Sequence, residues 1–185
     1  LLGVQRVIYT SSITAATKGK PTNLYGATKK FNEEAAHVFA KHGLETVGLR
    51  LAQVYGPMMR VDGGIWRLGQ MVKTNRPIPD RMTGFGNKRS QVYIEDAAKT
   101  LVSALRVSLP ELNPIATVCA DDYLADYGDI VYALSTAMGK EVNNPKGYTL
   151  TPRTIKADVE PLERLRLHIP RTNLEDGMKI LARYL

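Results

Sequence analysis

Tyr25-Gly26-Ala27-Thr28-Lys29 is the stretch of sequence on which the fold and the chemistry of this chain depend, and Ser12 precedes its tyrosine by thirteen residues. Asn23 stands just before this stretch and can cap the exposed amides at the start of a helix. In such a helix, Tyr25 and Lys29 are one turn apart and lie on the same face. An ammonium beside a phenol favours the phenolate, which is the tuning that a general acid/base needs.

An apolar run, Val7-Ile8-Tyr9-Thr10, leads into Ser11 and Ser12, and it predicts a buried strand over residues 4–12. In α/β proteins, ligands bind at the edge of the sheet where the parallel strands end. A Ser12 hydroxyl at that edge could hold a substrate oxygen while Tyr25 takes or gives its proton. A Tyr-x-x-x-Lys spacing alone is weak evidence, because it also fits a half-buried tyrosine that packs beside a surface lysine.

Hydrophobic periodicity predicts alternating helices and strands along the rest of the chain. The predicted helices cover residues 23–42, 65–75, 97–106, part of 122–138 and the region after 172, and the predicted strands cover 46–54 and 116–120. Apolar faces are expected on the first helix and, facing inward, on the third: Phe31, Ala35, Val38 and Phe39, and Leu101, Val102 and Leu105. Asp96 is expected to cap the third helix, and Thr172 with Glu175 to form the capping box of the last.

The composition is that of a globular protein with a real core, since the chain has 185 residues of which 44% are apolar. No run approaches the length of a membrane span, so no membrane partner is expected. Cys119 is the only cysteine, which excludes an internal disulfide and favours the cytoplasm. His37 and His42 are not accompanied by a cysteine or a third histidine, so we expect no metal site.

The formal net charge of +7 is explained mostly by a solvated basic surface. Part of the excess suits an anionic small molecule such as a nucleotide. The charges are scattered and no basic stripe alternates with aromatic residues, so a nucleic-acid partner is not expected.

Four blocks of the sequence together resemble the short-chain dehydrogenase/reductase superfamily, and most of all its extended branch of sugar-nucleotide epimerases and dehydratases. The blocks occur in the order typical of that family and cover residues 7–12, 25–29, 49–57 and 84–96. The resemblance implies an α/β fold with a Rossmann-like doubly wound parallel sheet, incomplete at the N-terminus, and a small C-terminal α/β substrate-binding part.

The same resemblance implies a division of the chain into two parts. Residues 1–57 are expected to form the C-terminal half of the dinucleotide-binding domain, and 58–185 mainly the substrate-binding part, with 92–120 returning to the sheet. The Gly-rich turn that cradles a dinucleotide pyrophosphate does not occur in this sequence. The chain therefore looks like the C-terminal part of a longer enzyme.

The resemblance also assigns roles to individual residues. Ser12, Tyr25 and Lys29 are the implied catalytic residues, and NAD or NADP is implied to contact Thr10, Ser11, Tyr25, Lys29 and Leu51. Gln53, Arg89 and Arg153 are the implied substrate-binding residues, and a guanidinium suits a phosphate because its donors form a fixed fork. Arg50 is expected to be a structural ion-pair residue rather than a catalytic one.

The function that follows from the resemblance is an NAD(P)-dependent epimerase or dehydratase acting on a hydroxyl-bearing carbon of a nucleotide sugar. Tyr25 removes the hydroxyl proton while a hydride passes to the cofactor, and return of the hydride to the other face gives the epimer. Ile13 and Thr14 stand where a dehydratase usually carries an extra carboxylate, which counts against dehydration. We expect a cytoplasmic homodimer, paired through the helix over 23–42, with a small anionic substrate.

Two alternatives remain open from the sequence. A reductase of a non-nucleotide ketone or aldehyde is favoured by the short loop after Ser12 and by Ser90, which replaces the usual acid after Arg89. A non-catalytic fragment or scaffold is favoured by the missing cofactor cradle.

Overall fold

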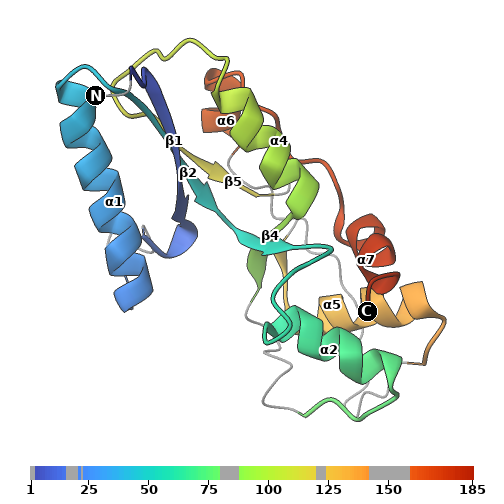
Figure 1. The fold of residues 1–185 in the computed structure, drawn as a ribbon. Coiled ribbons are helices and arrows are strands. Elements are labelled where there is room, and N and C mark those ends of the chain that lie inside the picture. The colour runs from blue at the N-terminus through green and yellow to red at the C-terminus, as the bar shows by residue number, and fades with distance from the viewer. Residues whose placement is uncertain (1–2, 16–20, 22, 80–87, 120–123, 142–158) are drawn as a thin grey trace. The chain divides into compact units, whose positions relative to one another are not determined.

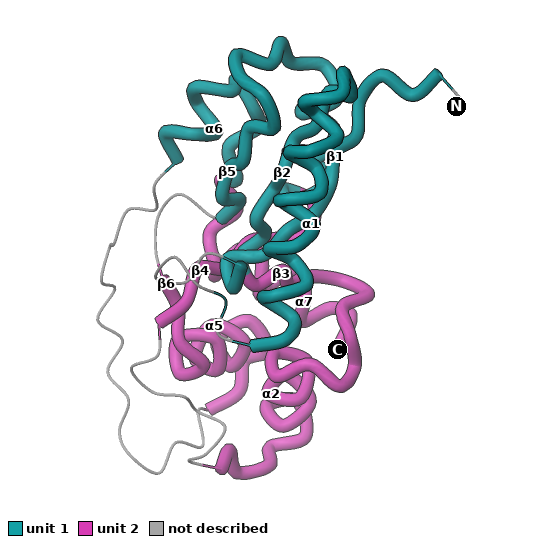
Figure 2. The backbone as a smooth tube through the Cα atoms, turned by 90° about the vertical axis from the view of Figure 1, so that its left-hand side faces the viewer, with its two compact units in different colours: residues 1–52, 96–119, 158–170 teal, residues 53–95, 120–157, 171–185 magenta. Residues whose placement is uncertain are grey.

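The structure is a computed structural model that describes residues 3–15, 21, 23–79, 88–119, 124–141 and 159–185. The chain forms two compact units, which Figure 2 shows in different colours. Unit 1 comprises Leu1–Ala52, Asp96–Cys119 and Asp158–Pro170, and unit 2 comprises Gln53–Glu95, Ala120–Ala157 and Arg171–Leu185. The chain thus leaves unit 1 after Ala52 and re-enters it at Asp96, whereas the division expected from the sequence changes at residues 57 and 92.

Unit 1 is built on a parallel sheet of three strands in the order β1-β2-β5. The strands are β1 (Arg6–Ser12), β2 (Glu45–Leu51) and β5 (Ile115–Val118). A short 3-10 turn, η1 (Ile13–Ala15), follows β1, and α1 (Leu24–Lys41) then carries the chain to β2. Figure 1 shows α1 on one side of this sheet, with α4 (Ile94–Ala104) and α6 (Glu160–Arg164) on the other. The predicted alternation of strand and helix over residues 4–54 is confirmed. Val4 and Val7 are exposed, so the prediction that the first strand is buried along its length is wrong.

The helix faces that contact the sheet are not the faces with the largest apolar side chains. In α1 the buried residues are Gly26, Glu33, Ala36 and Ala40, while Phe31, Val38 and Phe39 are exposed. In α4 the buried residues are Asp96, Ala97, Thr100 and Ala104, so the inward face predicted with Val102 and Leu105 is wrong. Small side chains allow close approach to the sheet, which explains why the bulky apolar stripes lie elsewhere.

Asp96 is not the cap of α4, because this helix already begins at Ile94. Its carboxylate is buried and lies 3.0 Å from Nε2 of His168. Thr100 Oγ1 donates to the main-chain oxygen of His168, and the main-chain nitrogen of His168 donates to Ser103 Oγ at 3.0 Å. α4 therefore holds the segment after α6 through these three contacts within unit 1.

The described part of unit 2 combines short strands with three helices. The strand β4 (Arg89–Tyr93) pairs in parallel with β3 (Gln53–Tyr55) and antiparallel with β6 (Leu124–Ala125). The helices are α2 (Gly64–Lys73), α5 (Tyr127–Met138) and α7 (Leu174–Ala182). The cap of α7 is Asn173, whose Oδ1 accepts from Asp176 N at 2.8 Å, so the predicted capping box at Thr172 and Glu175 is wrong by one residue.

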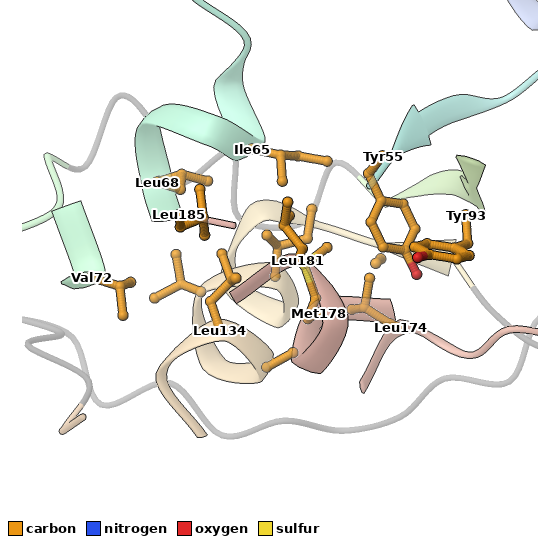
Figure 3. Close-up of a cluster of buried hydrophobic side chains, with 14 of the residues drawn as sticks. Tyr55, Ile65, Leu68, Val72, Tyr93, Leu134, Leu174, Met178, Leu181 and Leu185 are labelled. Carbon is orange, nitrogen blue, oxygen red and sulfur yellow. The ribbon is translucent and has the colours of Figure 1, made fainter. Parts of the chain in front are cut away.

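The core of unit 2 lies among these helices and the strand ends, and Figure 3 shows its side chains converging. The rings of Tyr55 and Tyr93 meet edge to face with their centroids 5.8 Å apart. The helices contribute residues that are almost fully buried: Ile65, Leu68, Val72, Ile130, Val131, Leu134, Leu174, Met178 and Leu181.

Gly177 on α7 gives room to the ring of Tyr55. A Cβ at Gly177 would overlap the Tyr55 hydroxyl and approach Cε2 at 2.7 Å. The hydroxyl also donates to the main-chain oxygen of Asn173, near the start of the same helix, at 3.4 Å. The glycine is therefore required by packing and not by its backbone conformation.

Gly177→Ala should lower the free energy of unfolding by about 1–3 kcal/mol, because overpacking against Tyr55 costs more than the ~1 kcal/mol that alanine gains over glycine in a helix. Chemical denaturation measures the change. The same substitution in a Tyr55→Phe background should cost less, since the hydroxyl that it meets is gone. A stabilising effect of Gly177→Ala in the wild-type background would contradict this account of the core.

Candidate active site

The end of β1 places Ser12 beside the turn η1. Ser12 is buried, and its Oγ accepts from the main-chain nitrogen of Thr14 at 3.3 Å and from the Thr14 hydroxyl at 3.0 Å. A serine hydroxyl that accepts these bonds still has its own proton to donate. Ser12 can therefore donate to an oxygen atom placed at this end of the strand.

The start of α1 packs against the same turn. Asn23 caps the helix by accepting from Gly26 N at 2.8 Å. A Cβ at Gly26 would lie 2.6 Å from the main-chain oxygen of Thr14, so only glycine allows this approach. The contact brings the first turn of α1, which carries Tyr25, against the turn that is hydrogen-bonded to Ser12.

Lys29 links Tyr25 to the end of β1. Its Nζ donates to the main-chain oxygen of Thr10 at 3.0 Å and lies 5.7 Å from the centroid of the Tyr25 ring. An ammonium has three donors, so Lys29 retains donors for a further acceptor, such as the hydroxyls of a cofactor ribose. Tyr25 itself is 56% exposed, which leaves its hydroxyl accessible to a ligand.

Tyr9 lies on β1, the same strand as Ser12, and is half-buried. Burial raises the pKa of Tyr9 to about 12, although its hydrogen bond to Asn113 Oδ1, at 2.9 Å, acts in the other direction. A phenol with this pKa keeps its proton near neutral pH. Tyr9 is therefore a poor candidate for proton transfer, and Tyr25 remains the candidate that the sequence predicts.

A buried ion pair fixes α1 to the sheet. Arg50 on β2 donates to both carboxylate oxygens of Glu33, through Nε and Nη2, each at 2.7 Å. Ser11 Oγ on β1 donates to Glu33 Oε1 at 2.6 Å, and the Glu33 side chain is only 1% exposed. The prediction that Arg50 is a structural ion-pair residue is confirmed.

The electrostatics of Glu33 follow from these contacts. Burial raises the pKa of Glu33, but the hydrogen bonds from Arg50 and Ser11 and the charge of Arg50 outweigh it, so the pKa lies below its usual value. Sequence reasoning missed Glu33. The available signal was its spacing, because Glu33 follows Lys29 by four residues and Tyr25 by eight, on one stripe of the helix.

The remaining predicted cofactor contacts lie at the same ends of β1 and β2. Thr10 is exposed, Ser11 is buried, and Leu51 is half-buried and opposite Ser12 in the strand register. The structure thus brings Thr10, Ser11, Ser12, Leu51 and the Tyr25–Lys29 turn together within unit 1.

The predicted substrate residues belong to unit 2. Gln53 begins β3 and is half-buried, and its Oε1 lies 3.4 Å from Nε2 of Gln91 on β4. Arg89 begins β4 and is exposed. Arg153 lies outside the described residues.

Part of the basic excess is gathered in unit 2. Four cations, from Lys73, Lys140, Lys179 and Arg183, line a surface depression of about 600 Å³. They lie at or just beyond the last turns of α2, α5 and α7, where a cation is stabilised by the helix dipole. Their placement therefore has a structural explanation.

Two further searches concern the described part of the chain alone. No group of three or more His, Cys, Asp or Glu residues there is placed to hold a metal ion. None of the helices there has both the length and the apolar character to cross a membrane.

Comparisons with known proteins agree on one family. Residues 2–113 match the model of the NAD dependent epimerase/dehydratase family. A probable UDP-glucuronate 4-epimerase of Rhizobium meliloti is 33% identical over 108 residues, which cover 57% of this chain and 31% of that protein. An uncharacterized UDP-glucose epimerase of Bacillus subtilis, YtcB, is 27% identical over 190 residues, which cover 95% of this chain and 58% of that protein.

Solved structures show the same fold. The UDP-glucuronic acid 4-epimerase from Bacillus cereus, crystallised with UDP-glucuronic acid and NAD, superposes with a TM-score of 0.76 at 24% identity, over 97% of this chain and 60% of that one. The predicted Rossmann-like α/β fold is confirmed. The chain spans about half the length of the first curated relatives that it matches, 53% and 49%.

Glu33→Gln should lower the free energy of unfolding by about 2–4 kcal/mol, because it leaves the Arg50 guanidinium without a buried counter-charge. Urea denaturation at pH 7 measures the loss. Glu34→Gln is the matched control, since Glu34 is exposed and forms only a surface ion pair with Lys30, and it should change stability little. Equal effects of the two substitutions would contradict the anchoring role of Glu33.

The same ion pair predicts a loss of stability in acid. Because the pKa of Glu33 is lowered in the folded state, its contribution is fully present above the usual value of 4.5 and is lost as pH falls through the folded-state value. Urea denaturation between pH 7 and pH 3 should show a steeper decline for the wild type than for Glu33→Gln. If stability fell equally with pH in the wild type and in Glu33→Gln, other carboxylates would be the cause of the acid sensitivity.

Proposed function

The chain belongs to the NAD dependent epimerase/dehydratase family, and we propose that it provides the catalytic centre and the substrate-binding part of an oxidoreductase that acts on a hydroxyl-bearing carbon of a nucleotide sugar. The main support is the position of Lys29, whose ammonium lies between the end of β1 and the exposed ring of Tyr25. This arrangement suits a general acid/base that works at a sheet edge.

In the proposed reaction, Tyr25 as phenolate removes the proton from a substrate hydroxyl. Lys29 stabilises the negative charge on the phenol oxygen and holds ribose hydroxyls with its remaining donors. Ser12 donates a hydrogen bond to the substrate oxygen and keeps that oxygen beside Tyr25. When bound, NAD or NADP supplies the hydride acceptor. The Tyr25 proton returns to the same oxygen when the hydride returns to the carbon, so epimerisation is redox-neutral overall.

We assign the cofactor and the substrate to different residues. In unit 1, Thr10, Ser11 and Leu51 line the cofactor side, and Ser11 contributes its main chain because its hydroxyl is bound to Glu33. In unit 2, Gln53 and Arg89 bind the anionic part of the substrate, and we assign Arg153 the same role. Donor groups of this kind suit phosphate oxygens.

The names of the relatives support a uronic acid or hexose attached to UDP as the substrate class. The Rhizobium meliloti relative is a probable UDP-glucuronate 4-epimerase, and the Bacillus cereus structure contains UDP-glucuronic acid. UDP-glucuronic acid carries the negative charge that the basic chain would attract. Turnover of UDP-glucuronic acid would separate this proposal from the reductase alternative, which requires a non-nucleotide carbonyl substrate.

We further propose that the exposed apolar stripe of α1 pairs two copies of the chain. Leu24, Phe31 and Val38 follow one another at intervals of seven residues and are 81%, 70% and 54% exposed. A seven-residue spacing keeps side chains on one side of a helix, as in helix pairs that bury a common seam. A second copy offers an identical stripe, and a two-fold axis would bury both.

Tyr25→Phe should abolish turnover of UDP-glucuronic acid, with a loss of at least about 10²-fold in kcat, because the substrate proton has no acceptor. The assay uses the protein as its gene encodes it, with NAD present. Tyr184→Phe is the matched control, since Tyr184 is 58% exposed and Tyr25 56%, and it should leave kcat unchanged. Full activity of Tyr25→Phe would rule out the proposed mechanism.

Phe31→Asp should convert a dimer to a monomer, because it introduces a charge at the centre of the stripe. Light scattering coupled to size-exclusion chromatography gives the mass directly. Val102→Asp on α4 places the same charge on another exposed apolar residue and should leave the mass unchanged. A wild-type protein that is monomeric at assay concentrations would refute the pairing.

A further inference from the structure

Gln91 has a buried side-chain amide that joins two residues of the candidate substrate site. It lies on β4 and is 4% exposed. Its Nε2 is 3.4 Å from Gln53 Oε1 and 3.4 Å from the main-chain oxygen of Arg89. The amide nitrogen carries two hydrogens, so each of these acceptors can receive one. All three residues belong to unit 2.

The register of β3 and β4 explains why the two glutamine side chains are in contact. Gln53 and Gln91 are partners in the β3–β4 ladder, two residues before the Tyr55–Tyr93 pair. Side chains two residues apart leave a strand on the same face. The side chains of Gln53 and Gln91 therefore lie on the same face of the β3–β4 ladder as the rings of Tyr55 and Tyr93, which Figure 3 shows in the core.

The Arg89 carbonyl determines which way both amides point. A carbonyl oxygen can only accept, so the Gln91 atom that faces it must be the amide nitrogen. The same nitrogen then requires an acceptor on Gln53, which turns Gln53 Oε1 toward Gln91. The Gln53 NH₂ group is consequently directed away from Gln91, with its donors available to another group.

The Gln91 amide is poorly explained by stability alone. Its Oε1 is buried and has no hydrogen-bond partner within the described ranges of the chain, and a buried acceptor without a donor destabilises the folded state. An apolar side chain of the same length would avoid that penalty. The amide therefore calls for an explanation in terms of its two hydrogen bonds.

We propose that Gln91 is a positioning residue that orients the Gln53 amide so that its NH₂ group faces an acceptor-only group of the substrate. The inference rests on the proposed function and deepens it. The recognised chemistry is an anionic oxygen of a nucleoside diphosphate, which accepts from Gln53 and from the Arg89 side chain. An amide turned the other way would present its oxygen and repel that group.

The test compares Gln91→Met with Gln53→Leu and with the double variant, in the protein as its gene encodes it. UDP is the probe, and its Kd is measured by calorimetry. Gln91→Met should weaken UDP binding about three- to tenfold, as expected for a weakened hydrogen bond to a charged group. It should leave the melting temperature unchanged or raise it. In the Gln53→Leu background, Gln91→Met should have no further effect on Kd.

Gln70→Met is the matched control, because the Gln70 amide also donates to a main-chain oxygen, that of Leu185, at 3.0 Å in unit 2. It should leave the Kd for UDP unchanged. A lower melting temperature with unchanged UDP binding in Gln91→Met would make Gln91 a structural residue and overturn the inference. An equal loss of affinity with and without Gln53 would overturn it as well.

A second readout does not depend on UDP. Side-chain NH₂ signals in NMR spectra of the ligand-free protein should show slow exchange with solvent for Gln91 and fast exchange for Gln53. The opposite pattern would overturn the proposed orientation. A wild-type protein that binds no UDP but shows the expected exchange pattern would contradict the proposed function and leave the orientation standing.

Discussion

The candidate active site depends on the ion pair between Glu33 of α1 and Arg50 of β2. The sheet-facing side of α1 otherwise consists of small residues, Gly26, Ala36 and Ala40, and their burial gives little preference for one rotation of the helix over another. Two charge-assisted hydrogen bonds from Arg50 and one from Ser11 are directional. They determine which side of α1 faces the sheet, a role in which buried ion pairs are better attested than in raising stability.

The rotation of α1 about its axis determines where the side chains of Tyr25 and Lys29 lie. Tyr25, Lys29 and Glu33 follow one another at intervals of four residues, so they form a single stripe along the helix. The inner end of this stripe is anchored by Arg50, and the outer end carries the exposed phenol. Lys29 stands between them and contacts the end of β1 through the Thr10 carbonyl. A helix rotated by one residue would lose the ion pair and would also move Lys29 away from the Thr10 carbonyl.

The sequence predicted the elements that carry the candidate site better than it predicted their packing. The Tyr25–Lys29 spacing, the strand that ends at Ser12 and the ion-pair role of Arg50 could be derived because each depends on residue identity at a fixed spacing. The buried faces of α1 and α4 could not, because apolar periodicity finds the largest apolar stripe, and these helices turn small residues to the sheet instead. Glu33 was missed for the same reason, since an acid within a helix is usually solvated. Gln91 could not be identified as a partner of Gln53 without the register of β3 and β4.

The sheet-facing stripe of α1 and its exposed apolar stripe require different kinds of residue. The stripe toward the sheet requires a glycine where Thr14 approaches, small residues where the helix touches the strands, and one acid opposite Arg50. The stripe with Leu24, Phe31 and Val38 requires only apolar volume, which many side chains supply. A large apolar residue at position 36 or 40 would raise the apparent amphipathicity of the helix and push it off the sheet. The small residues and the buried acid on the sheet side of α1 therefore hold the helix in place, and the geometry of the candidate site follows from them.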